Sequence, residues 1–192
     1  YMGLVEIGVG LIPAAGGCKE LLRRVVSPAM KTPGVNPLPF LQRVFETISL
    51  AKVGGSAAEA REMGFLGDGD RIVMNRDHLL AEAKRMVLEL AAAGYRPPSR
   101  GKNVYATGRD ALAALLVGVH QMEAGGFASA HDAKIARKLA FVLCGGDLSE
   151  GQWVDEQYIL DLEREAFLSL LGEAKTIERI WHMLQTGKPL RN

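Results

Sequence analysis

The hydrophobic residues of this chain recur at intervals of three and four positions, the spacing that places side chains on one face of a helix. In residues 40–50, for example, Leu41, Val44 and Ile48 form such a series. The same pattern predicts helices over 18–26, 40–50, 56–64, 75–93, 109–123, 130–144, 153–171 and 174–186. Apart from the short helix at 56–64, about seven helices stand against one or two short strands, so the predicted fold class is mainly α.

Breaks between the helices indicate how the chain is divided. Residues 1–17 are rich in glycine and β-branched residues and fit a short strand or turn that leads into a helix, and Arg71–Met74 is a candidate strand. Residues 94–108, which contain two adjacent prolines, predict a linker or surface loop. We therefore predict two regions, 1–93 and 109–192, joined by this linker.

Composition narrows the possible functions. The chain has 192 residues, of which 23 are basic and 22 acidic. Because phosphate binding needs clustered Lys and Arg, this balance argues against nucleic acid as the main partner. No run approaches the roughly 18 apolar residues of a membrane helix. Cys18 and Cys144 lie far apart in apolar or glycine-rich surroundings, so we expect reduced, buried thiols and a cytoplasmic protein. Tyr1 opens directly inside an apolar run, which is typical of the middle of a domain.

Two groups of polar residues favour structural roles. The four histidines form no HExxH pattern and have no CxxC partner, so no metal site is predicted. The pair His131-Asp132 is more typical of a helix start, where Asp interacts favourably with the helix dipole. The carboxylates around Glu163 and Glu165 allow a paired-carboxylate catalytic site, but we expect a solvated helix face.

Glu6 is the strongest catalytic candidate. The series Gly8-x-Gly10 that follows it fails as a dinucleotide fingerprint, because Pro13 stands where the third glycine is needed. Glu6 itself lies in an apolar run, where shielding from water favours proton transfer near neutral pH. The N–H groups of residues 14–17, at the start of the next helix, could bind a water or an anion. From the residues alone, an exposed glutamate at a strand edge is an equal alternative.

The segment around Glu6 resembles a motif of the crotonase (enoyl-CoA hydratase/isomerase) superfamily. Residues 3–17, GLVEIGVGLIPAAGG, follow the pattern G-x-P-E-x-x-x-G-x-x-P-G-x-G-G. Val5 and Ala14 depart from it, since they replace a proline and a glycine. Residues 56–66, SAAEAREMGFL, resemble the family's A-x-E-A-x-x-x-G-L-V helix and turn.

Later runs resemble one subgroup, the C-terminal end of long bacterial 3-hydroxyacyl-CoA dehydrogenases, in which a crotonase region follows an NAD-dependent dehydrogenase. These runs are SAHDAKIARKLAFVLCGGDLSEG, EQYILDLEREAFLSLLGEAKT and ERIWHMLQTGKPLRN. The resemblance implies a C-terminal fragment of a crotonase-like (ClpP/crotonase) α/β fold and a role in fatty-acid β-oxidation. The parent protein would hydrate trans-2-enoyl-CoA and oxidise 3-hydroxyacyl-CoA. Acyl-CoA would be the substrate, NAD would bind in the missing dehydrogenase domain, and the fragment would hold no cofactor.

The resemblance also assigns roles to residues. In crotonases two glutamates activate a water, and two backbone N–H groups form an oxyanion hole. Glu6 matches the second glutamate, a general acid/base, while Gly10, Pro13 and Ala14 match positions that place the water and substrate. Lys188, in the final GKP, matches a basic residue near the CoA phosphates. The first glutamate and the oxyanion hole precede the matching motif, so we expect the fragment alone to be inactive.

Two alternatives remain open. The helices of residues 109–186 could form a non-catalytic docking or oligomerisation module that packs against the missing N-terminal region or another subunit. A crotonase relative with isomerase or hydrolase activity would carry the same motif, because the discriminating residues lie upstream.

Overall fold

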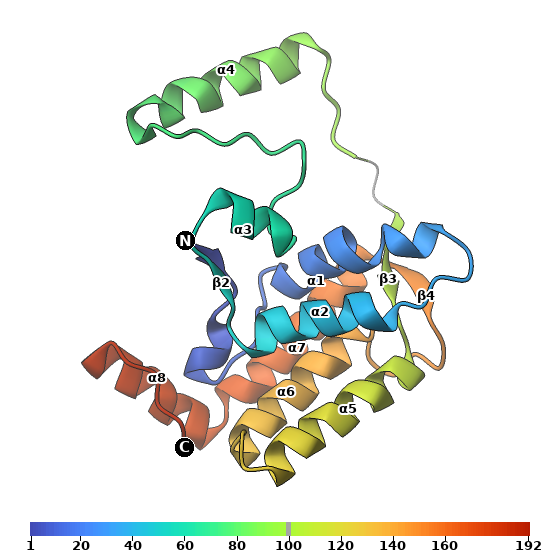
Figure 1. Ribbon diagram of the computed structural model, residues 1–192, viewed down its shortest axis with the longest axis vertical. Coiled ribbons are helices and arrows are strands. Elements are labelled where there is room, and N and C mark those ends of the chain that lie inside the picture. The colour runs from blue at the N-terminus through green and yellow to red at the C-terminus, as the bar shows by residue number, and fades with distance from the viewer. Residues whose placement is uncertain (99–100) are drawn as a thin grey trace.

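The computed structural model describes residues 1–98 and 101–192, and this part of the chain is mainly helical (Figure 1). It contains eight α-helices, four short 3-10 or π turns (η) and two small antiparallel sheets. The elements in chain order are β1 (Met2–Gly3), η1 (Glu6–Val9), α1 (Gly17–Leu21), η2 (Leu22–Val26), η3 (Ala29–Lys31), α2 (Leu38–Ser49), β2 (Val53–Gly54), α3 (Ala57–Glu62), η4 (Arg76–His78), α4 (Leu79–Ala92), β3 (Lys102–Ala106), α5 (Arg109–Ala124), α6 (Ala130–Leu143), β4 (Gln152–Asp155), α7 (Glu156–Leu171) and α8 (Ala174–Thr186). The mainly α class is therefore confirmed for the described residues.

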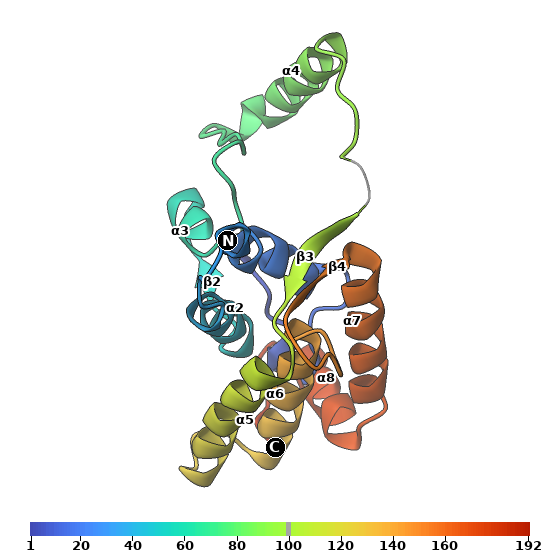
Figure 2. The same cartoon turned by 90° about the vertical axis from the view of Figure 1, so that its right-hand side faces the viewer.

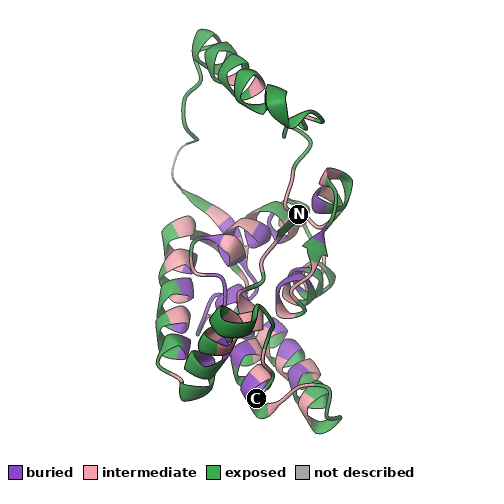
Figure 3. Cartoon of the chain, turned by 90° about the vertical axis from the view of Figure 1, so that its left-hand side faces the viewer, coloured by how far each residue is buried: buried purple, intermediate pink, exposed green. Residues whose placement is uncertain are grey.

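One hydrophobic cluster joins the N-terminal and C-terminal parts of the chain. α1, α2 and η2 pack together, and α6 contacts α1, α2 and α7. Fully buried members of the cluster come from each of these helices, among them Leu22, Leu41, Leu139 and Ile159. Figure 3 shows the buried residues concentrated in this body of the molecule. The domain boundaries expected from the sequence stay predictions, although the core crosses them.

The N-terminal segment forms a strand, a turn and a helix, as its composition predicts. β1 pairs antiparallel with β2, and the η1 turn then leads towards α1. α1 continues directly into the π turn η2. The helix predicted over 18–26 is therefore confirmed, and its second half is a π-helix.

The structure differs from the sequence pattern at three extended segments. Residues 71–74 form no strand, because no other described segment of the chain pairs with them through backbone hydrogen bonds. The predicted linker 94–108 contains β3, which pairs with β4 and places Val104 and Ala106 in the core; residues 99–100 of that linker lie outside the described part. The helix predicted from residue 153 begins only at 156, because residues 152–155 form β4.

Helix α4 stands apart from the rest of the chain. Figures 1 and 2 both show it separated from the body of the molecule. None of its residues is buried, and Leu80 and Val87 are 82% and 63% exposed. No helix in the described residues is long and apolar enough to cross a membrane.

Candidate functional site

Glu6 is the first residue of the tight η1 turn, and backbone hydrogen bonds close that turn. The N–H of Gly10 donates to the carbonyl of Ile7 at 3.0 Å, and the N–H of Leu11 donates to the carbonyl of Glu6 at 3.1 Å. Gly10 ends the turn with φ at 86°, a left-handed conformation that glycine adopts without a steric penalty. The backbone at Glu6 is therefore held in a short, hydrogen-bonded turn.

Glu6 lines a cleft at the start of α1. The cleft is lined by Leu4, Glu6, Pro13, Ala15, Gly16, Gly17, Lys19, Glu20 and Leu160. The Oε2 atom of Glu6 is buried and has no hydrogen-bond partner among the described residues. A buried oxygen without a partner is unusual in a folded protein, so the hydrogen-bonding capacity of this atom is left unused by the described residues.

A second cavity, of about 310 Å³, is also lined in part by the η1 turn. Ile7 and Gly8 form part of its wall, and its apolar lining includes Met122 and Phe127. Asp132 is the one carboxylate in this lining, and it is already paired with a buried arginine at 2.7 Å. Because this cavity offers no free group for proton transfer, the cleft at Glu6 is the candidate site.

The carboxylate of Glu163 binds the start of α1 and is fully buried, so the solvated face predicted for it was wrong. Glu163 comes from α7 and accepts hydrogen bonds from the N–H of Gly16 at 2.8 Å and of Lys19 at 2.6 Å. Burial raises its pKa, and the two N–H groups oppose that shift. The expectation that the N–H groups of residues 14–17 are free for an anion is thus corrected at Gly16, whose N–H is bonded to the protein's own carboxylate.

A group of paired charges lies at the edge of the cleft. The ammonium of Lys19 is bonded to Glu20 and, at 2.7 Å, to Glu156. Burial acts to lower the pKa of Lys19, but these two hydrogen bonds outweigh burial and raise it. The pKa of Glu20 falls to about 2, because hydrogen bonds from Arg23, Lys19 and Arg24 outweigh its burial. The cleft therefore has a fixed cation beside it that keeps its charge at neutral pH.

The Cys18 thiol is fully buried. Burial raises its pKa well above the usual range, and the negative charges of Glu163 and Glu6 raise it further. Cys144 is also buried and free, and burial raises its pKa to about 11. Both cysteines are thus buried, unpaired thiols, and neither is suited to act as a nucleophile.

The structure separates the residues predicted to act with Glu6. Pro13 lines the cleft beside it, but Ala14 does not, and Ala15 and Gly16 line the cleft in its place. Gly10 ends the turn and does not line the cleft. Lys188 is exposed in the C-terminal tail and does not line the cleft. The roles assigned to these residues stay predictions.

Lys19 and Glu163 were missed as parts of the site. Glu163 could have been found from the sequence, because it shares one helix face with the buried residues Ile159, Ala166 and Leu170. A charged residue in an apolar stripe indicates a buried partner. Lys19 gave no comparable signal, since its partner Glu156 is distant in the sequence.

The helix start predicted at His131-Asp132 is present. Ser129 caps α6, and Asp132 completes a reciprocal capping box with it. His131 has a further contact: its ring is buried and bonded to Thr176 of α8 at 3.0 Å. Within residues 1–98 and 101–192, no three His, Cys, Asp or Glu side chains are grouped so as to hold a metal ion.

Comparison with known proteins relates the chain to one part of a longer protein. It is 52% identical over 196 residues to a probable 3-hydroxyacyl-CoA dehydrogenase of Bacillus subtilis (strain 168). That match covers the whole of this chain but only 24% of the relative. No family model matches the chain. No solved structure matches it either.

Proposed function

We propose that this chain is part of a longer β-oxidation enzyme and supplies one catalytic carboxylate for the hydration of trans-2-enoyl-CoA. The observation that carries the proposal is the buried, unpartnered Oε2 of Glu6 at a glycine-rich cleft. The similarity to a probable 3-hydroxyacyl-CoA dehydrogenase supports the second half of the role, the oxidation of 3-hydroxyacyl-CoA. Acyl-CoA is then the substrate, and NAD binds in a part of the protein outside this chain.

In this reaction a water adds across the 2,3 double bond, so that one carbon gains a hydroxyl group and the other gains a proton. Glu6 acts as the general acid/base, which requires a carboxylate within hydrogen-bonding reach of the reacting groups. The cleft shields it on one side through Leu4 and Pro13. The oxyanion hole and the other glutamate come from the part of the enzyme that precedes this motif. Of the four residues that the motif singles out, Glu6 and Pro13 line the cleft, and Gly10 ends the turn that carries Glu6.

The test is the substitution Glu6→Gln in the longer protein. We expect hydration of enoyl-CoA to fall by about a hundredfold or more, as the loss of a general acid/base does, while NAD-dependent oxidation of 3-hydroxyacyl-CoA stays unchanged. Glu46→Gln, at an exposed position of α2, is the matched control. Unchanged hydration in the Glu6 variant would remove this residue from the mechanism.

The 192-residue chain by itself provides a second measurement. We expect it to hydrate crotonyl-CoA far more slowly than the longer protein, because it contributes only one of the two glutamates. Turnover close to that of the longer protein would contradict the division of the site. A product with a shifted double bond, or free CoA, would instead favour isomerase or hydrolase chemistry.

A second candidate function is docking, and the exposed helix α4 favours it. Its apolar side chains lie in solvent, which is costly unless another surface covers them. The partner would be the remainder of the longer protein or another subunit. This role is compatible with catalysis at Glu6, since α4 does not line the cleft.

A further inference from the structure

A chain of hydrogen bonds connects the Glu6 turn with two distant helices. The hydroxyl of Thr176, in α8, donates to the carbonyl of Gly10 at 3.0 Å. Nε2 of His131, in α6, lies 3.0 Å from the same hydroxyl oxygen. A hydroxyl has one proton to donate, and here the Gly10 carbonyl takes it, so His131 must donate from Nε2. The three groups therefore form a directed series from α6 through α8 to the end of the turn.

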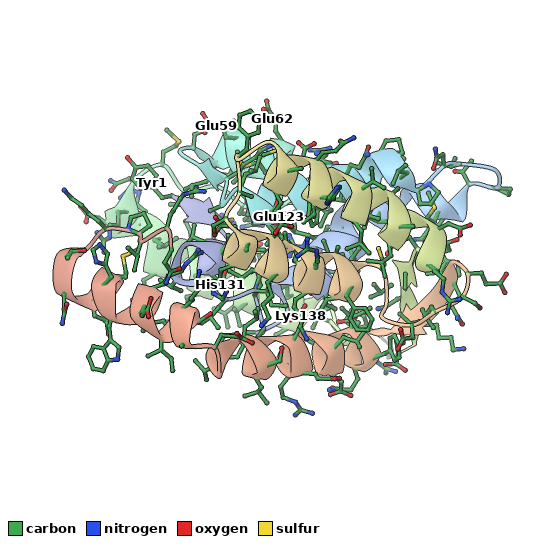
Figure 4. All side chains as sticks on the ribbon, turned by 90° about the horizontal axis from the view of Figure 1, so that it is seen from below. Tyr1, Glu59, Glu62, Glu123, His131 and Lys138 are labelled. Carbon is green, nitrogen blue, oxygen red and sulfur yellow. The ribbon has the colours of Figure 1, made fainter. Side chains whose placement is uncertain are left out.

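Every member of this series is enclosed. Thr176 has no exposed surface and His131 is only 4% exposed. Figure 4 labels His131 on α6, and its bond to Thr176 places the ring between α6 and α8. Burial and the positive charge of Arg179 lower the pKa of His131, which keeps the ring neutral and able to hold one fixed proton arrangement. Buried polar groups that are all bonded have few alternative geometries.

Thr176 is the one side chain among the described residues that hydrogen-bonds to the backbone of residues 5–11. Its contact with Gly10 is also steric: a Cβ at Gly10 would lie 2.9 Å from the threonine hydroxyl. The carboxylate Oε2 of Glu6 has no partner of its own. The direction of that carboxylate therefore depends on the backbone of the turn, and Thr176 holds the end of that backbone.

α8 is in turn fixed to α6 by an ion pair. The guanidinium of Arg179, one turn beyond Thr176, is 2% exposed and lies 2.7 Å from the carboxylate of Asp132. Asp132 follows His131 directly. The two residues that reach the Glu6 turn are thus held at a defined separation by a neighbouring pair of charges.

We propose that Thr176 and His131 are positioning residues for the carboxylate of Glu6, acting through the carbonyl of Gly10. This inference rests on the proposed function, because it needs Glu6 to act in hydration. It assigns a catalytic purpose to helices α6 and α8, which lie more than a hundred residues after Glu6 in the chain. A displacement of about 1 Å at a reacting group can lower a rate by up to about a hundredfold.

The test compares Thr176→Val, Thr176→Ser and His131→Gln in the longer protein, with Glu6→Gln measured in the same assay. We expect Thr176→Val to lower kcat for hydration by about tenfold or more with little change in KM, and Thr176→Ser to restore most of it. His131→Gln should lower kcat in the same direction. Thr47→Val is the matched control, because Thr47 is a buried helical threonine whose hydroxyl bonds to its own helix at the Arg43 carbonyl.

The outcomes separate the two proposals. If Glu6→Gln leaves hydration unchanged, the proposed function fails. If Glu6→Gln abolishes hydration while Thr176→Val and His131→Gln match the Thr47→Val control, the positioning role alone fails. A loss in Thr176→Val that Ser does not restore also overturns it, since the hydroxyl would then not be responsible. Should Thr176→Val not fold, His131→Gln measured against the Thr47→Val control decides the question.

Discussion

At the scale of single residues, Glu163 shows why a buried carboxylate need not be catalytic. Its two oxygens accept hydrogen bonds from the backbone N–H groups of Gly16 and Lys19, which start a helix. These N–H groups have no partner within their own helix, so the carboxylate satisfies them and interacts with the positive end of the helix dipole. Glu6, by contrast, keeps an oxygen without a partner. The difference in hydrogen bonding separates a structural carboxylate from a candidate catalytic one.

We predict that Glu163→Ala lowers the free energy of unfolding of the chain by about 2–4 kcal/mol, because it leaves two buried N–H groups unsatisfied. Glu163→Gln should cost less, since its amide oxygen still accepts one of these bonds. Glu165→Ala, at an exposed position of the same helix, should stay within about 0.5 kcal/mol of the unchanged chain. Urea unfolding measures all three, and equal losses for the two alanine variants would contradict the capping role.

At the scale of elements, the helices follow from local periodicity but the strands do not. α2 and α6 form where the apolar spacing places them, and a capping box also marks the start of α6, because a helix satisfies most of its backbone within itself. β3 has only five residues and finds its partner β4 about fifty residues later in the chain. Its hydrogen bonds depend on that distant segment. The local pattern of Lys102–Ala106 therefore does not predict the pairing.

Helix α4 is the element whose sequence pattern and environment disagree. Its apolar face is the kind that normally faces a core, yet the structure leaves it in solvent. The periodicity predicts the helix and its face correctly. Which surface covers that face is a question of tertiary or quaternary contact.

We predict that replacing Leu80 and Val87 together by serine changes the free energy of unfolding of the chain by less than about 1 kcal/mol, since neither side chain is buried. The same change should weaken self-association or binding to the rest of the longer protein, as measured by light scattering. Leu139→Ala is the contrasting variant, and its fully buried side chain should cost about 2–5 kcal/mol. A core-sized loss of stability in the α4 variant would show that α4 packs on the body of the chain.

At the scale of the whole molecule, the charged groups respond to pH in opposite directions. The lowered pKa of His131 means that the folded chain binds fewer protons there than the unfolded chain does. Its contribution to stability is therefore lost as pH falls below about 6.5, the ordinary value for histidine. The raised pKa of Glu163 has the opposite effect, because there the folded chain binds more protons than the unfolded chain does. The lowered pKa of Glu20 affects stability only below about pH 4.5, the ordinary value for glutamate.

We predict that acidification from pH 7.5 to 5.5 destabilises the unchanged chain more than it destabilises His131→Gln. Glu163 is present in both proteins, so its effect cancels in the comparison. The measurement is the free energy of unfolding in urea at the two pH values. Equal changes in the two proteins would show that His131 accepts a proton without loss of the fold.

The sequence by itself determined the helices, the turn at Glu6 and the motif that makes Glu6 a candidate. These depend on neighbours within a few residues, where spacing, glycine positions and capping side chains act directly. Only the tertiary structure decided that Glu163 closes the helix start, that β3 pairs with β4 and that Thr176 holds Gly10. Each of these contacts joins groups that are about fifty or more residues apart in the chain. Their partners are chosen by the folding of the whole core, because a buried polar group must find whichever donor or acceptor the packed structure brings to it.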